Sequence, residues 1–97
     1  MATFVVLAGF TDQGIKKVKE TISRAEAFNE MAKKSGVTVM GLYWTLGRYD
    51  IIAVCEGPDD ETATALSLSL CSRGNIRSET LRAFSSDEMK GILEKIV

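Results

Sequence analysis

The segment Tyr43–Asp50, which reads YWTLGRYD, joins two apolar runs and decides the fold of this chain. The runs, Val37–Leu46 and Tyr49–Glu56, are both rich in residues that favour β-strands. A two-residue loop with glycine at its first position is typical of a type II′ turn. The pair Gly47-Arg48 therefore predicts a tight β-hairpin, with Trp44 opposite Ile51.

Side chains of this hairpin alternate between two faces, since successive strand residues point to opposite sides. We expect the apolar face to lie under helices, with Trp44 and Tyr49 in the core. That face holds Met40, Leu42, Trp44, Leu46, Tyr49, Ile51, Ala53 and Cys55. The other face is mixed and holds Gly41, Tyr43, Thr45, Asp50, Ile52, Val54 and Glu56.

Outward from the hairpin, two further strands are predicted over Thr3–Phe10 and Asn75–Phe84. A capping box at Ser23–Glu26 predicts the start of a helix, and Gly36 is a natural end for it. The loop Thr11–Gly14 is read as a strand exit in which Thr11 accepts a backbone hydrogen bond.

Similar start and end signals predict two more helices. Pro58 and the three carboxylates after it favour a helix start, and that helix ends near Gly74. A second capping box, Ser85–Glu88, predicts a closing C-terminal helix. The order β-α-β-β-α-β plus a helix predicts an α+β, ferredoxin-like fold with an antiparallel sheet of order 4-1-3-2 and both main helices on one face. We expect residues 1–97 to form a single domain.

Composition excludes several classes of function. The chain is 45% hydrophobic and 26% charged with a net charge of −1, which argues against nucleic-acid and membrane-surface binding. It has neither a transmembrane run nor a signal peptide, so we expect a cytoplasmic protein. The chain contains no histidine, and Cys55 and Cys71 lack metal-ligand spacing, so we expect no metal and no cofactor.

The mixed face of the hairpin is too apolar for water and too polar for a dry core. We therefore expect a homodimer or higher homo-oligomer whose open sheet faces pack together around a partly polar cavity. In strand four, Arg77 shares a face with Glu79, Leu81 and Ala83, and Arg82 shares the other with Ser78, Thr80 and Phe84. These arginines either form ion pairs at the sheet edge or bind an anionic ligand. The candidate ligand-binding residues are Tyr43, Thr45, Asp50, Arg77 and Arg82.

Several motifs resemble the GYD domain family, named for a Gly-Tyr-Asp signature that reads Gly47-Arg48-Tyr49-Asp50 here. Other matching stretches are FTDQG (Phe10–Gly14), RAEAF (Arg24–Phe28), PDDE (Pro58–Glu61) and LRAF (Leu81–Phe84). Many relatives carry proline where this chain has Ile22. The resemblance implies a subunit of the dimeric α+β barrel superfamily. That superfamily includes cofactor-free monooxygenases, muconolactone isomerases, haem-degrading enzymes and effector-binding modules, so fold does not fix function.

Three functions stay open at this point. The first is a non-catalytic homodimer that binds a small molecule in its cavity. The second is a cofactor-independent oxygenase or isomerase acting on a small cyclic or aromatic compound. In that enzyme Asp50 or Glu56 would be the base, and Tyr43 would stabilise the oxyanion. The third is a structural or assembly role, in which Asp50 stabilises the hairpin and the open face is used up by subunit contact.

Overall fold

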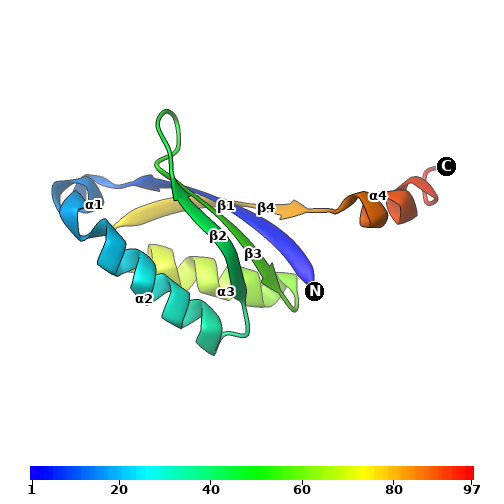
Figure 1. Ribbon diagram of the computed structural model, residues 1–97, viewed down its shortest axis with the longest axis horizontal. Coiled ribbons are helices and arrows are strands. Elements are labelled where there is room, and N and C mark those ends of the chain that lie inside the picture. Colours follow the sequence, from blue (N-terminus) through cyan, green and yellow to red (C-terminus); the bar gives the residue numbers. More distant parts are fainter.

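The computed structural model describes all 97 residues and has one four-stranded sheet of order β2-β3-β1-β4, in which every neighbouring pair is antiparallel (Figure 1). This α+β fold and strand order confirm the prediction. The elements are β1 (Ala2–Phe10), α1 (Asp12–Lys16), η1 (Val18–Glu20), α2 (Thr21–Lys34), β2 (Thr38–Trp44), β3 (Ile51–Gly57), α3 (Asp60–Cys71), β4 (Ile76–Ala83) and α4 (Ser86–Leu93). None of the helices combines the length and apolarity needed to span a bilayer.

Helices α2 and α3 cover one face of the sheet and leave the other face bare (Figure 1). The core lies in the covered layer, because the inward side chains of each strand alternate with outward ones. Its buried apolar residues are Phe4, Ala8, Phe28, Ala32, Val37, Ile51, Ala53, Cys55, Ala63, Leu66 and Ile76.

The bare side of the sheet is called the open face from here on. The strand registers place Thr3, Val5, Leu7, Gly9, Gly41, Tyr43, Ile52, Val54, Glu56, Arg77, Glu79, Leu81 and Ala83 on it. The opposite side of β4 meets α3, because the Thr80 hydroxyl bonds that of Ser67 and the Ser78 hydroxyl lies 3.3 Å from the Cys71 sulfur. This settles which arginine of β4 lies on the open face: it is Arg77.

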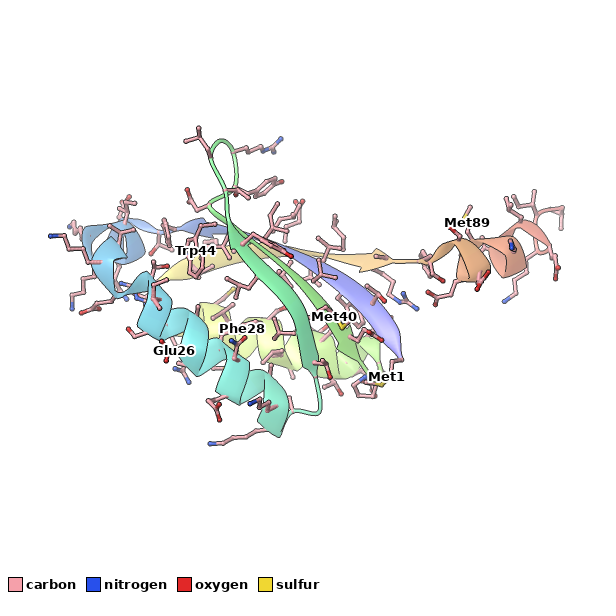
Figure 2. The ribbon with its side chains drawn as sticks, in the orientation of Figure 1. Met1, Glu26, Phe28, Met40, Trp44 and Met89 are labelled. Carbon is pink, nitrogen blue, oxygen red and sulfur yellow. The ribbon has the colours of Figure 1, made fainter.

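The central hairpin has the predicted pairing of Trp44 with Ile51 but differs at both ends. The ladder stops at that pair, and the loop beyond it is wider than a two-residue turn. One backbone bond of 2.8 Å, from Thr45 N to Asp50 O, closes the loop. At the other end a β-bulge between Val39 and Gly41 takes Met40 out of the helix-covered face. Met40 is 59% exposed, so its predicted place in the core was wrong (Figure 2).

The start of α2 also departs from the prediction. The helix begins at Thr21 with no side-chain cap, because the short helix η1 leads directly into it. Ser23 lies inside the first turn, and its hydroxyl donates to the Glu20 carbonyl at 2.8 Å instead of capping the helix. The predicted end is confirmed, since Gly36 has φ 77° just after the last turn.

A short helix, α1, ties the end of β1 to the turn between α3 and β4. Thr11 caps it by accepting from the Gly14 amide at 3.0 Å, as predicted, and also donates to the Gly74 carbonyl at 2.6 Å. Gly14 lies against Asn75 so closely that any Cβ would overlap the Asn75 carbonyl. The glycine is therefore required by this contact.

Helix α4 projects from the body of the molecule at the end of β4 (Figure 1). The predicted capping box is present: the Ser85 hydroxyl accepts from the Glu88 amide, and the Glu88 carboxylate accepts from the Ser85 amide. The radius of gyration is 14.6 Å, against about 12.5 Å expected for a compact chain of this length. The excess reflects an elongated molecule with extents of 50 × 30 × 19 Å.

Candidate functional site

The open face has an apolar centre and a polar rim. Val5, Leu7, Ile52 and Val54 fill the two middle strands and are only half-buried. At the β4 edge Leu81 is 44% exposed. Charged residues lie around this centre, Glu56 at one end and Arg77 and Glu79 along β4. A face of this composition is typical of a surface that contacts another protein.

Asp50 joins the hairpin to the end of β1. Its Oδ2 accepts from the Phe10 amide at 2.9 Å, and its own amide donates to the Ala8 carbonyl at 2.9 Å. The carboxylate thus takes the place of a strand carbonyl where the β1–β3 ladder has ended. The Asp50 side chain and backbone therefore join the hairpin to β1 within one chain.

Tyr49 does not lie in the core, where the alternation of side chains along the hairpin predicted it. The wide loop turns its ring toward the open face, where its hydroxyl donates to Glu79 Oε2 at 3.2 Å. Arg48 stacks on the same ring, with Cζ 5.6 Å from the centroid. Thr45 is also engaged within the loop, because its hydroxyl donates to the Tyr49 carbonyl at 2.6 Å. The alternation of side chains between two faces predicts the wrong side for Tyr49, because this alternation holds only where strand pairing continues.

Tyr43 lies on the open face, as expected, and is 62% exposed. Its ring covers Gly41, since a Cβ there would come within 2.9 Å of Tyr43 Cε2. Tyr43 and Arg77 stand on β2 and β4, the two edges of the sheet. The fold of a single chain therefore does not bring these two candidates together.

Trp44 faces the helix layer but is not a core residue. It is 42% exposed at the edge of the sheet, and its indole Nε1 donates to the Thr21 hydroxyl at 2.9 Å (Figure 2). The prediction of a buried Trp44 was wrong because β2 is an edge strand and α2 only begins beside it. The tryptophan links the strand to the first turn of the helix.

The two candidate arginines have different surroundings. Arg82 lies on the helix side and is held by Glu88 at 3.6 Å and by the ring of Phe84, 4.5 Å from its Cζ. It also donates to the carbonyls of Thr3 and Ala83. Arg77 is exposed opposite Gly9, and the ion pairs of the chain do not include it. Of the two, only Arg77 offers a free guanidinium to the open face.

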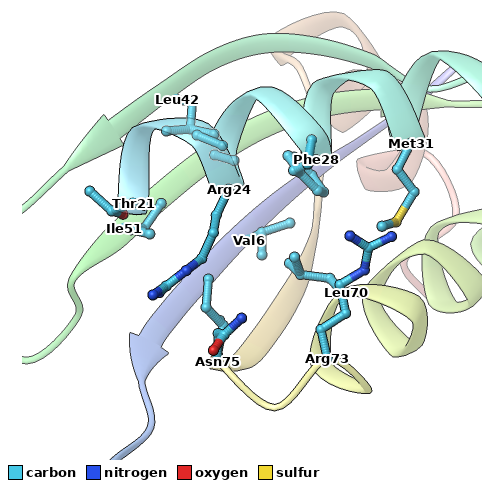
Figure 3. A pocket seen from close by; sticks show the side chains of 14 residues that line it. Val6, Thr21, Arg24, Phe28, Met31, Leu42, Ile51, Leu70, Arg73 and Asn75 are labelled. Carbon is cyan, nitrogen blue, oxygen red and sulfur yellow. The ribbon is translucent and has the colours of Figure 1, made fainter. Parts of the chain in front are cut away.

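A separate cavity of about 110 Å³ lies on the other side of the sheet, between α2 and the turn that follows α3 (Figure 3). Its walls are mainly apolar, with Val6, Phe28, Met31, Leu42 and Leu70 among them. Sequence reasoning missed this cavity. The signal was Arg24, a charged residue spaced as i, i+4 and i+7 with Phe28 and Met31 on one helix face.

The charged groups beside this cavity do not form an anchor for a ligand. The Arg24 guanidinium donates to the carbonyls of Gly14 and Lys17 and lies 3.7 Å from Glu20. The guanidinium groups of Arg24 and Arg73 lie at different parts of the cavity, so they do not converge on one point (Figure 3). Arg24 instead fastens α1 and η1 to α2.

Titratable groups with shifted pKa values lie away from the open face or are buried. Burial raises the pKa of the Cys55 thiol, which favours the protonated, unreactive form. The Thr62 amide lowers the pKa of Asp59, and the Ser85 amide lowers that of Glu88. Both carboxylates cap helices. No three potential ligand side chains gather as a metal site requires.

Similar proteins give this arrangement a context. A protein of Thermus thermophilus, named glutamine synthetase and cystathionine beta-lyase binding protein, is 37% identical over 84 residues, covering 86% of this chain and 88% of that one. The solution structure of the C-terminal domain of the MgtC protein from Mycobacterium tuberculosis has a TM-score of 0.58 and 13% identity. The match covers 86% of this chain and 88% of that domain, a likeness of fold alone. The family model described as GYD domain matches residues 4–93. This chain therefore belongs to the GYD domain family.

Proposed function

We propose that the protein is a homodimer joined through its open face, and that the dimer is a binding protein for a metabolic enzyme. The observation that carries the first part is the uncovered apolar centre of the sheet. A four-stranded sheet with helices on one side leaves Val5, Leu7, Ile52 and Val54 only half-buried, and burying them fully stabilises a dimer by about 25 cal/mol per Å² of apolar area removed from water.

The second part is supported by the relative from Thermus thermophilus, whose name states that it binds glutamine synthetase and cystathionine beta-lyase. The alignment runs through most of both chains, covering 86% of this one and 88% of that one. The engagement of the Asp50 carboxylate with the Phe10 amide also favours binding over catalysis. Asp50, one of the two expected bases of the enzyme hypothesis, has a structural task instead.

Sedimentation velocity at micromolar concentration tests the dimer. We expect the wild-type chain to be a dimer and Val54→Lys to be a monomer with an unchanged far-UV circular dichroism spectrum, because the new charge lies at the centre of the contact. Leu81→Lys, at the exposed edge of the same face, is a second variant should Val54→Lys fold poorly. The matched control is Leu68→Lys on α3, where Leu68 is 66% exposed in the helix layer. A monomeric wild-type chain would contradict the proposal.

Enzyme binding is tested separately with the glutamine synthetase and the cystathionine beta-lyase of the same organism. Each enzyme is immobilised, and the retention of this protein is followed by surface plasmon resonance. We expect saturable binding to one of them. Retention by neither enzyme would rule out the second part of the proposal and leave the dimer intact.

A second candidate function is the binding of a small anionic molecule between the two open faces. The observation that favours it is the exposed Arg77 guanidinium, which has no ion-pair partner. A thermal-shift screen of carboxylate and phenolic metabolites would reveal such a ligand, because binding to the folded state raises the melting temperature. Arg77→Gln would abolish the shift, and Arg73→Gln, on the opposite layer, would keep it.

A further inference from the structure

Two exposed apolar surfaces lie at different ends of the molecule, outside the open face. The first is the stripe formed by Met89 and Leu93 on α4 and by Ile96 in the turn just after it, which are 43%, 54% and 69% exposed. The second is Leu46 at the tip of the β2–β3 loop, which is fully exposed at 104%. Neither surface has a partner within its own chain.

Helix α4 needs a partner from outside the chain. Isolated helices shorter than about 12 residues are marginal in water, and their stability comes from packing an amphipathic face. Only Phe84 and Ser85 separate the helix from β4. Arg82 then fixes its direction through the ion pair with Glu88 and the stacking on Phe84. These contacts hold α4 pointing away from its own sheet.

We propose that α4 of each subunit docks on the β2–β3 loop of a second copy, with the stripe Met89–Leu93–Ile96 covering Leu46. This proposal rests on the homodimer proposed above. The loop rises from the sheet on the side opposite α2 and α3, and α4 leaves from the far end (Figure 1). A two-fold axis lying between the two open faces and perpendicular to the strands therefore brings the loop of one subunit to the α4 of the other, twice.

The size of the contact favours the same partner. A stable interface uses roughly 20 to 30 residues on each side, and the open face by itself offers fewer. Adding α4 and the loop brings the total into that range and covers Leu46 and the α4 stripe together. A second copy related by a two-fold axis covers both exposed surfaces with one symmetric contact.

Cysteine cross-linking tests this contact. Two single variants, Leu46→Cys and Leu93→Cys, are made in a Cys71→Ser background, mixed so that subunits exchange, and oxidised. Both positions are exposed, so folding does not depend on them; Cys55 is buried and stays unreactive. We expect a disulfide-linked dimer on a non-reducing gel from the mixture, and none from either variant alone. Leu68→Cys mixed with Leu93→Cys is the matched control and gives no cross-link.

Sedimentation of the same mixture separates the two ways to fail. A dimer without the cross-link between positions 46 and 93 overturns the docking of α4 while the open-face dimer stands. A monomer overturns both. A cross-link equally abundant in the control pair shows random collision and also overturns the proposal.

Discussion

At the residue scale, Asp50 holds the end of β1 to the central hairpin. In Asp50→Ala the Phe10 amide loses its acceptor in a partly buried position. We expect the free energy of unfolding to fall by about 1–3 kcal/mol, the cost of an unsatisfied buried donor. Urea denaturation followed by circular dichroism measures it. Asp50→Asn keeps a side-chain oxygen as acceptor and should lose less; equal stability of all three proteins would show that the bond contributes nothing.

Gly14 is a residue that the fold cannot replace without a local shift. A Cβ would overlap the Asn75 carbonyl, so Gly14→Ala must push α1 away from the α3–β4 turn. We expect a loss of about 2–3 kcal/mol in unfolding free energy, a typical cost of overpacking. The control is Gly91→Ala in α4, where a Cβ meets nothing within 4 Å. That variant should unfold at the same or a slightly higher urea concentration than the wild type, because alanine favours a helix interior over glycine; a loss comparable to that of Gly14→Ala would contradict the steric explanation.

At the scale of elements, one side-chain hydrogen bond, from Trp44 to Thr21, adds to the apolar packing between β2 and α2. A double-mutant cycle with Trp44→Phe and Thr21→Val isolates it, because each change removes the bond and keeps most of the apolar contact. We expect a coupling energy of about 0.5–1.5 kcal/mol from urea denaturation. Additive effects of the two changes would show that the strand and helix are not coupled here.

The start of α4 depends on pH through Glu88. The pKa of this carboxyl is lowered in the folded chain, chiefly because its carboxylate accepts from the Ser85 amide. The capping contact is therefore fully present above the ordinary glutamate pKa of 4.5 and is lost as pH falls through the lowered pKa. We expect the backbone chemical shifts of Met89 and Leu93 to move toward coil values in that acidic range. Glu88→Gln should remove this pH dependence, and an unchanged titration in the variant would assign it elsewhere.

At the scale of the whole molecule, the proposed dimer makes stability depend on concentration. Burying the open face in a partner stabilises the folded state by mass action. We therefore expect the melting temperature of the wild-type chain to rise with protein concentration. Val54→Lys should melt at the same temperature at every concentration. A wild-type melting temperature that does not change between micromolar and millimolar chain would contradict the dimer.

Sequence patterns predicted the covered layer of the molecule well. Strand periodicity, the Trp44–Ile51 pairing, the glycine stop at Gly36 and the capping box at Ser85 all reappear in the structure. Each is local or period-based: it depends on residues within one strand, one hairpin or one helix turn. The order of the strands follows from these elements because crossover connections are right-handed.

The candidate site was predicted less well, because the positions of side chains in loops and at sheet edges depend on contacts with residues distant in sequence. Tyr49 turns to Glu79 of β4, and Trp44 meets Thr21 rather than the core. The bulge at Met40 and the wide loop after Trp44 interrupt the two-residue alternation of side chains from which the two faces were predicted.

The sequence by itself therefore determined the fold class, the strand order and the family of this protein, since periodicity, turns and helix caps depend on residues that are close together in the sequence. Only the tertiary structure decided which charges are free. It engaged Asp50 with Phe10 and Arg82 with Glu88, and left Arg77 and the stripe of α4 without partners. The physical reason is that a hydrogen bond or ion pair forms only where the folded chain brings two groups within about 3–4 Å. The separation of two residues along the sequence does not predict that distance.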